Sequence, residues 1–96
     1  MNFDDFLEST DADISPDDLS PALLALWWDK KGEWDIAHNT AQKTENKNGA
    51  WVHAYLHRKE GDKFNAGYWY TKAQKAECTT SLEEEWESIV RDLLER

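Results

Sequence analysis

A short pattern occurs twice in the chain, as KKGEWDIA at 30–37 and as KEGDKFNA at 59–66, so that the copies start 29 residues apart (59 minus 30). Three kinds of residue match between the copies, a glycine, the acid after it and a later alanine: Gly32 with Gly61, Glu33 with Asp62, and Ala37 with Ala66. A glycine readily takes the left-handed backbone that ends a helix, and an acid can cap the next one. Each copy therefore predicts two antiparallel helices joined by a tight turn.

Helix signals flank the repeated pattern on both sides. Ser20 and Pro21 are typical of a helix start, since serine caps the first turn and proline fits the first helical position. Ser81 and Glu84 form a capping box, and an apolar stripe follows at helical spacing, made of Leu82, Trp86, Ile89, Val90, Leu93 and Leu94. No segment shows the alternation of a half-buried strand. The predicted fold class is all-α.

The predicted organisation is one helical domain over residues 1–96. It consists of an N-terminal capping segment at 1–19, a first hairpin at 20–45, a second hairpin at 49–75 and a C-terminal helix at 81–96. A short N-terminal helix is expected to precede five main helices, near 20–31, 33–44, 49–60, 62–75 and 82–95. The apolar periodicity of these segments accounts for a core without a metal ion.

Two stacked helical hairpins resemble the tetratricopeptide repeat, whose units are tandem antiparallel helix pairs. The departures from that family are a shorter spacing, glycines that fall in turns, and no closing proline. The chain from 20 to 96 also resembles a family of short bacterial all-helical proteins marked by two segments, W-D-x-A-H-x-x-A-Q and W-V-H-A-Y-L-H-R-x-E-G-D, found here at 34–42 and 51–62. That resemblance implies a helical fold and brings no activity with it.

The formal net charge of −9 is unevenly distributed. Residues 1–20 hold seven acids and no base (−7), 77–96 hold seven acids and two arginines (−5), and 21–76 hold six acids and nine bases (+3). An acidic surface repels phosphate backbones, so nucleic acid is not an expected partner. We expect no membrane contact, because no apolar run reaches the ~18 residues of a span. The single Cys78 and the acidic N-terminus favour a cytoplasmic location.

Candidate metal ligands lie in the second marked segment. His53 and His57 are four residues apart and Glu60 is three further, so their side chains share one helix edge. His38 could add a ligand from the preceding helix. This spacing can hold a divalent metal, although the glutamate that His-Glu-x-x-His metalloproteases need is missing. The alternative is that the imidazoles only hydrogen-bond to neighbouring side chains inside a packed helix pair.

Catalysis is a weaker alternative for the same region. Several acid–base residue types could do general acid–base work if a cleft gathered them: His38, His53, His57, Glu60, Arg58 and Tyr55. The sequence shows no recognisable nucleophile, phosphate loop or cofactor motif, so we expect no cofactor and do not predict an enzyme.

The function favoured by the sequence is a protein-interaction module. Helical repeats form concave faces that grip peptides or partner helices. One stripe on the helix at 49–60 consists of Trp51, Tyr55 and Arg58. Residues of these types often contribute most of the binding free energy at protein–protein interfaces. An acidic or C-terminal peptide segment would suit them, and a homodimer is a further possibility. The alternative is that the terminal helices cover this stripe as part of the core.

Overall fold

The computed structural model describes residues 1–95, which form helices and loops with no strand. The helices are α1 (Phe3–Ser9), α2 (Pro21–Lys30), α3 (Trp34–Gln42), α4 (Lys47–Lys59), α5 (Lys63–Ala73) and α6 (Leu82–Leu94). The predicted all-α class is confirmed, and each of the five main helices begins and ends within two residues of its predicted range. No helix in this part of the chain is long and apolar enough to cross a membrane. The cytoplasmic location stays a prediction.

The two glycine turns have the same backbone geometry. Gly32 has a φ of 84° and Gly61 a φ of 88°, both in the left-handed region. In each turn the glycine N–H donates to the carbonyl three residues earlier, and the next N–H donates to the carbonyl five residues earlier, at distances of 2.9 to 3.1 Å. This pair of bonds closes a helix and reverses the chain. Consequently α2 packs on α3 and α4 packs on α5. The finer likeness to tetratricopeptide units stays a prediction.

Two of the helix ends that differ from the expected positions have clear local reasons. The helix α4 begins two residues before the expected Gly49 because Asn46 is its cap: the Asn46 Oδ1 accepts from the Gly49 N–H at 2.8 Å. The helix α5 ends at Ala73 rather than near 75, because Gln74 adopts a left-handed φ of 59°. Its N–H bonds to the Thr71 carbonyl and stops the helix.

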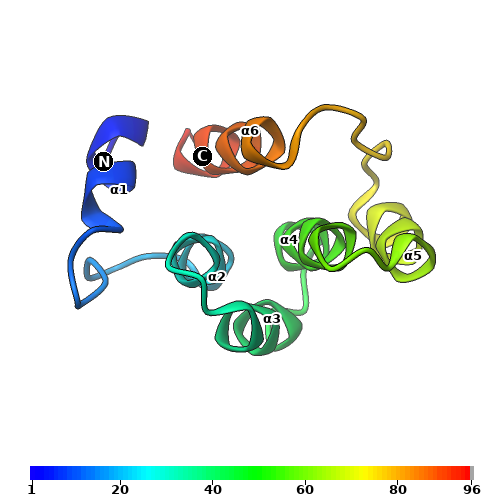
Figure 1. The fold of residues 1–96 in the computed structure, drawn as a ribbon, viewed down its shortest axis with the longest axis horizontal. Coiled ribbons are helices and arrows are strands. Elements are labelled where there is room, and N and C mark those ends of the chain that lie inside the picture. Colours follow the sequence, from blue (N-terminus) through cyan, green and yellow to red (C-terminus); the bar gives the residue numbers. More distant parts are fainter. Residues whose placement is uncertain (96) are drawn as a thin grey trace.

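The core lies between the row formed by α2, α3 and α4 and the two terminal helices, α1 and α6, which lie on one side of that row (Figure 1). Its largest fully buried side chains are Trp27, Phe6, Leu26, Leu56, Ile89, Val52 and Val90. A smaller apolar cluster of Ala54, Ala66 and Tyr70 joins α4 to α5. The helix α4 contacts α2, α3, α5 and α6, so it is the element around which the other helices are arranged.

Candidate metal site

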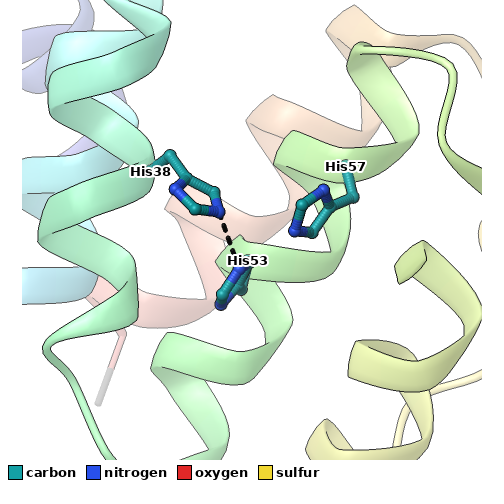
Figure 2. Close-up of side chains that lie close together, drawn as sticks. All are labelled: His38, His53 and His57. Atoms are coloured by element: carbon teal, nitrogen blue, oxygen red, sulfur yellow. Dashed lines mark hydrogen bonds between the residues drawn. The ribbon is translucent and has the colours of Figure 1, made fainter.

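Three histidines meet where α3 and α4 pack together. His38 comes from α3, while His53 and His57 lie one turn apart on α4, and Figure 2 shows the three rings close together. The Nε2 atoms of His38 and His53 are 3.0 Å apart. One ring nitrogen from each of the three lies within 4.8 Å of the other two. These are all the histidines in the chain, so the fold gathers its whole complement of imidazoles in one place.

Two tryptophans hold the rings of this histidine cluster in place. Trp34, one turn before His38 on α3, stacks on the His38 ring with centroids 4.8 Å apart and an interplanar angle of 13°. Trp69 of α5 stacks on His53 at 3.9 Å and 15°. The Trp34 indole is itself fixed, because its Nε1 donates to the Leu56 carbonyl at 3.0 Å. The aromatic walls therefore limit how far His38 and His53 can turn.

A carboxylate orients the third histidine. The Nδ1 of His57 lies 2.6 Å from the Oε1 of Glu60, three residues further along the chain. With Nδ1 bonded to this carboxylate, the Nε2 of His57 remains as a ligand atom. Figure 2 shows a ring nitrogen of His57 on the side of the other two rings. A carboxylate behind a histidine is a common arrangement at metal centres, where it fixes the ring and makes the imidazole more basic.

The surroundings keep two of the imidazoles neutral. Burial, and after it the charges that His38 and His57 carry when protonated, lowers the pKa of His53 to about 4. Burial and then His57 also lower the pKa of His38, against the opposite effect of Glu60 and Asp35. At neutral pH both rings are therefore neutral, and each has one nitrogen lone pair. One of the two Nε2 atoms donates the hydrogen bond between them, so its proton must move to Nδ1 before both Nε2 atoms can bind a metal.

The structure places the predicted interaction residues mostly inside the molecule. Tyr55 is only 2% exposed, and its hydroxyl donates to the Asp29 Oδ2 at 3.0 Å. Arg58 donates to the Glu85 Oε1 at 2.8 Å and to a loop carbonyl. Trp51 is half-buried, with the Lys75 ammonium 4.2 Å from the centroid of its ring. Tyr55 and Arg58 thus use their polar atoms within the fold, and their role toward a partner stays a prediction.

The same contacts reveal two buried carboxylates that the sequence analysis did not single out. Asp29 is 3% exposed and accepts from Tyr55 and from the Lys59 ammonium at 2.8 Å. Glu85 is 2% exposed and accepts from Arg58 and from the Tyr70 hydroxyl. Each carboxylate therefore has one tyrosine and one cation as partners, which is what a buried charge requires.

The larger cavities lie away from the histidine cluster. One of about 540 Å³ opens between α2, α4 and the start of α6, and its lining includes Asp29, Lys30, Lys59 and Trp86 but none of the three histidines. The histidine cluster instead sits in a narrow gap between helices. His53 is buried, while His38 and His57 are half-buried, so a small ion could reach the cluster past these two rings.

Comparison of the chain with protein-family models, with curated proteins and with solved structures finds no match. The resemblance to a bacterial helical family, which rests on the segments at 34–42 and 51–62, stays a prediction. Among the predicted site residues, the structure brings His38, His53, His57 and Glu60 together. Trp34 and Trp69 stack on two of these histidine rings. Trp34 could have been found from its position four residues before His38, whereas no local signal points to Trp69.

Proposed function

We propose that the protein binds a divalent transition-metal ion of the zinc type through the side chains of His38, His53 and His57. The observation that carries the proposal is the convergence of three imidazole nitrogens within 4.8 Å from two different helices. Imidazole nitrogen is a preferred ligand of Zn²⁺, Cu²⁺ and Ni²⁺, whereas Ca²⁺ and Mg²⁺ prefer oxygen. The composition of the cluster therefore favours the first group of metals.

The distance between two of the three ligands already suits zinc. Two imidazoles bound tetrahedrally at about 2.0 to 2.1 Å from the ion have nitrogens roughly 3.3 Å apart. The Nε2 atoms of His38 and His53 are already 3.0 Å apart. His57 must change more, because its ring stacks on the His53 ring with centroids 4.8 Å apart and an interplanar angle of 21°. A rotation of His57 out of this stack would complete a three-nitrogen site and leave the fourth position to water. Glu60 supports the ring of His57 from behind, as an outer partner does at known metal sites.

Metal binding at this position would join the two hairpins. His38 belongs to the first hairpin, and His53 and His57 belong to the second, so one ion bonded to all three links α3 to α4. The protein does not need the ion in order to fold, because its apolar core already includes residues from both hairpins. The proposed role of the metal is to tighten a fold that exists without it.

Isothermal titration calorimetry with zinc chloride tests this proposal. We expect one ion per chain in the wild type. His38→Ala and His57→Ala each remove a ligand, so each should weaken zinc binding by at least about tenfold, the lower limit seen when only an outer partner is lost. Gln42→Ala, an exposed change at the end of α3, is the control and should bind like the wild type. Absence of zinc binding, or binding that neither histidine variant weakens, would refute the proposal.

A further inference from the structure

The turn between α4 and α5 gathers a second set of candidate metal ligands. His57 lies in the last turn of α4, Glu60 follows that helix, and Asp62 caps the start of α5. One ligand atom from each of the three residues lies within 4.8 Å of the other two. The closest pair is the His57 Nδ1 and the Glu60 Oε1, which are 2.6 Å apart. Unlike the histidine cluster, this set combines one imidazole with two carboxylates.

The local backbone and one amide side chain hold the two carboxylates in place. Gly61, in the left-handed region with a φ of 88°, reverses the chain between Glu60 and Asp62. The Asp62 Oδ1 accepts from the Asn65 backbone N–H at 3.1 Å, and its Oδ2 accepts from the Asn65 side-chain amide at 2.6 Å. A carboxylate has about four acceptor positions, so Asp62 can still bind an ion while Asn65 fixes its orientation.

The other glycine turn shows that the fold does not need these ligands. The turn at Gly32 closes with the same pair of backbone hydrogen bonds. At the repeat offset of 29 residues, Trp28 and Lys31 occupy the positions of His57 and Glu60. A tryptophan and a charged lysine have no lone pair to offer a metal ion. The histidine and the glutamate are therefore not required to form the turn, which points to a second role for them.

We propose that the α4–α5 turn is a second metal site, which takes an oxygen-preferring divalent ion such as Mn²⁺ on His57, Glu60 and Asp62 and competes with the histidine cluster for His57. Carboxylates suit Mn²⁺, and the single imidazole makes the site less suitable for Ca²⁺ and Mg²⁺, which take oxygen ligands. Glu60 is exposed and the other two residues are half-buried, so water can complete the coordination. The competition rests on the proposed zinc site, whereas the turn site itself does not.

An ion in the turn replaces the proton between His57 and Glu60. Neighbouring ligands of a small octahedral ion held at about 2.1 Å are roughly 3.0 Å apart, so this 2.6 Å pair opens only slightly. With its Nδ1 on the ion, a neutral His57 carries its proton on Nε2 and has no lone pair left for the histidine cluster. Zinc also needs His57 to rotate out of its stack on His53, which the ion opposes. The two sites therefore exclude each other.

Electron paramagnetic resonance of Mn²⁺ tests the turn site without zinc. The sharp signal of free Mn²⁺ is lost on binding, and we expect the metal-free wild type to bind one ion per chain. Asp62→Asn keeps the helix cap, because asparagine caps as well as aspartate, and removes a charged ligand. Binding should weaken at least about tenfold, the lower limit seen when only an outer partner is lost. Glu33→Gln, at the matching position of the other turn, is the control and should bind like the wild type.

Zinc titration in the presence of Mn²⁺ tests the competition. By mass action, Mn²⁺ at a free concentration one hundred times its own Kd should raise the apparent Kd for zinc about 100-fold in the wild type. Asp62→Asn at the same Mn²⁺ concentration should show a rise of about tenfold or less, because its turn site binds Mn²⁺ more weakly.

His38→Ala separates the two proposals, because it removes a ligand of the histidine cluster and leaves the turn site complete. This variant should bind Mn²⁺ like the wild type. A failure of zinc to bind, with Mn²⁺ binding intact, would refute the histidine site alone. Absence of Mn²⁺ binding by the wild type, or binding that Asp62→Asn does not weaken, would overturn the turn site. A zinc affinity that saturating Mn²⁺ leaves unchanged would overturn the competition for His57.

Discussion

Two groups of buried or half-buried polar side chains flank α4. They are the histidine cluster toward α3 and the carboxylates Asp29 and Glu85 toward α2, α5 and α6. Each carboxylate is matched by a tyrosine hydroxyl and a cation, so its charge is compensated inside the protein. The histidines are three groups of the same kind facing one another. Burial and mutual repulsion lower the pKa values of His38 and His53.

This difference separates polar side chains that stabilise the fold, the two carboxylates, from polar side chains that could bind a ligand, the three histidines. The carboxylates are already satisfied by side chains, and nothing further is needed to stabilise them. Of the histidines, His38 and His53 are kept neutral by burial and bond to each other, and His57 bonds to Glu60. A metal ion is the partner that could bind all three rings together. The predictions below distinguish the two groups, beginning with the largest effect.

Removing a satisfied carboxylate should cause the largest loss of stability. Glu85→Ala leaves Arg58 without its partner and empties a buried position, and breaking a buried pair costs about 3 to 5 kcal/mol. Urea unfolding measures this loss. Glu87→Ala removes the exposed partner of Arg91 on the same helix and should cost about 1 kcal/mol or less. Equal losses in the two variants would show that Glu85 is not a structural group.

Zinc should stabilise the fold through the histidine cluster. At a free concentration one hundred times its Kd, an ion that binds only the folded state raises the free energy of unfolding by about 2.7 kcal/mol. Thermal unfolding with and without zinc measures this gain. A chelator should remove the gain and leave cooperative unfolding. If His57→Ala is stabilised by zinc as strongly as the wild type, the ion binds elsewhere.

The carboxylate behind His57 should affect zinc affinity and leave the fold intact. Glu60→Gln keeps the shape of the side chain and removes its charge, so zinc binding should weaken by about 10- to 100-fold. Calorimetry with zinc gives the affinity. Glu87→Gln, which changes an exposed carboxylate of α6, is the matched control and should not alter it. If Glu60→Gln binds zinc as tightly as the wild type, Glu60 has no role in the metal site.

Acid should destabilise the metal-free protein. The pKa values of His38 and His53 are lower in the folded state than the ordinary value of 6.5, so the unfolded chain binds protons first. The stability they contribute is complete above pH 6.5 and is lost as the pH falls toward 4. Between pH 7.5 and 5 the free energy of unfolding should fall by about 1 to 2 kcal/mol.

Urea unfolding at several pH values with a chelator present checks this loss. His53→Gln removes the more strongly shifted group and should flatten the pH dependence over the same range. A free energy of unfolding that stays constant or rises as the pH is lowered from 7.5 to 5 would contradict the account of the cluster.

The sequence predicted the features that depend on neighbouring residues. Ser20 and Ser81 cap helices as expected, with each hydroxyl accepting from a backbone N–H three residues later. Gly32 and Gly61 end helices because glycine adopts the left-handed backbone conformation at little energetic cost. The approach of His57 to Glu60 follows from their helical spacing, since residues three apart share an edge.

Contacts between helices were harder to predict. The meeting of His38 with His53 depends on how α3 rotates against α4, which the spacing within either helix does not determine. Glu85 directly follows two other glutamates, Glu83 and Glu84, and a run of acids gives no sign of burial. Its position between Leu82 and Ile89 nevertheless places it on the apolar side of α6, and that register was the available signal.

X-ray absorption at the zinc edge of the loaded protein tests the central claim most directly, because it reports the ligands themselves. We predict three imidazole nitrogens at about 2.0 to 2.1 Å and one oxygen, in a four-coordinate shell. The multiple-scattering signal of imidazole should weaken by one ring in His57→Ala. A six-coordinate shell of oxygens, or a wild-type spectrum with no imidazole signal, would contradict a three-histidine metal site.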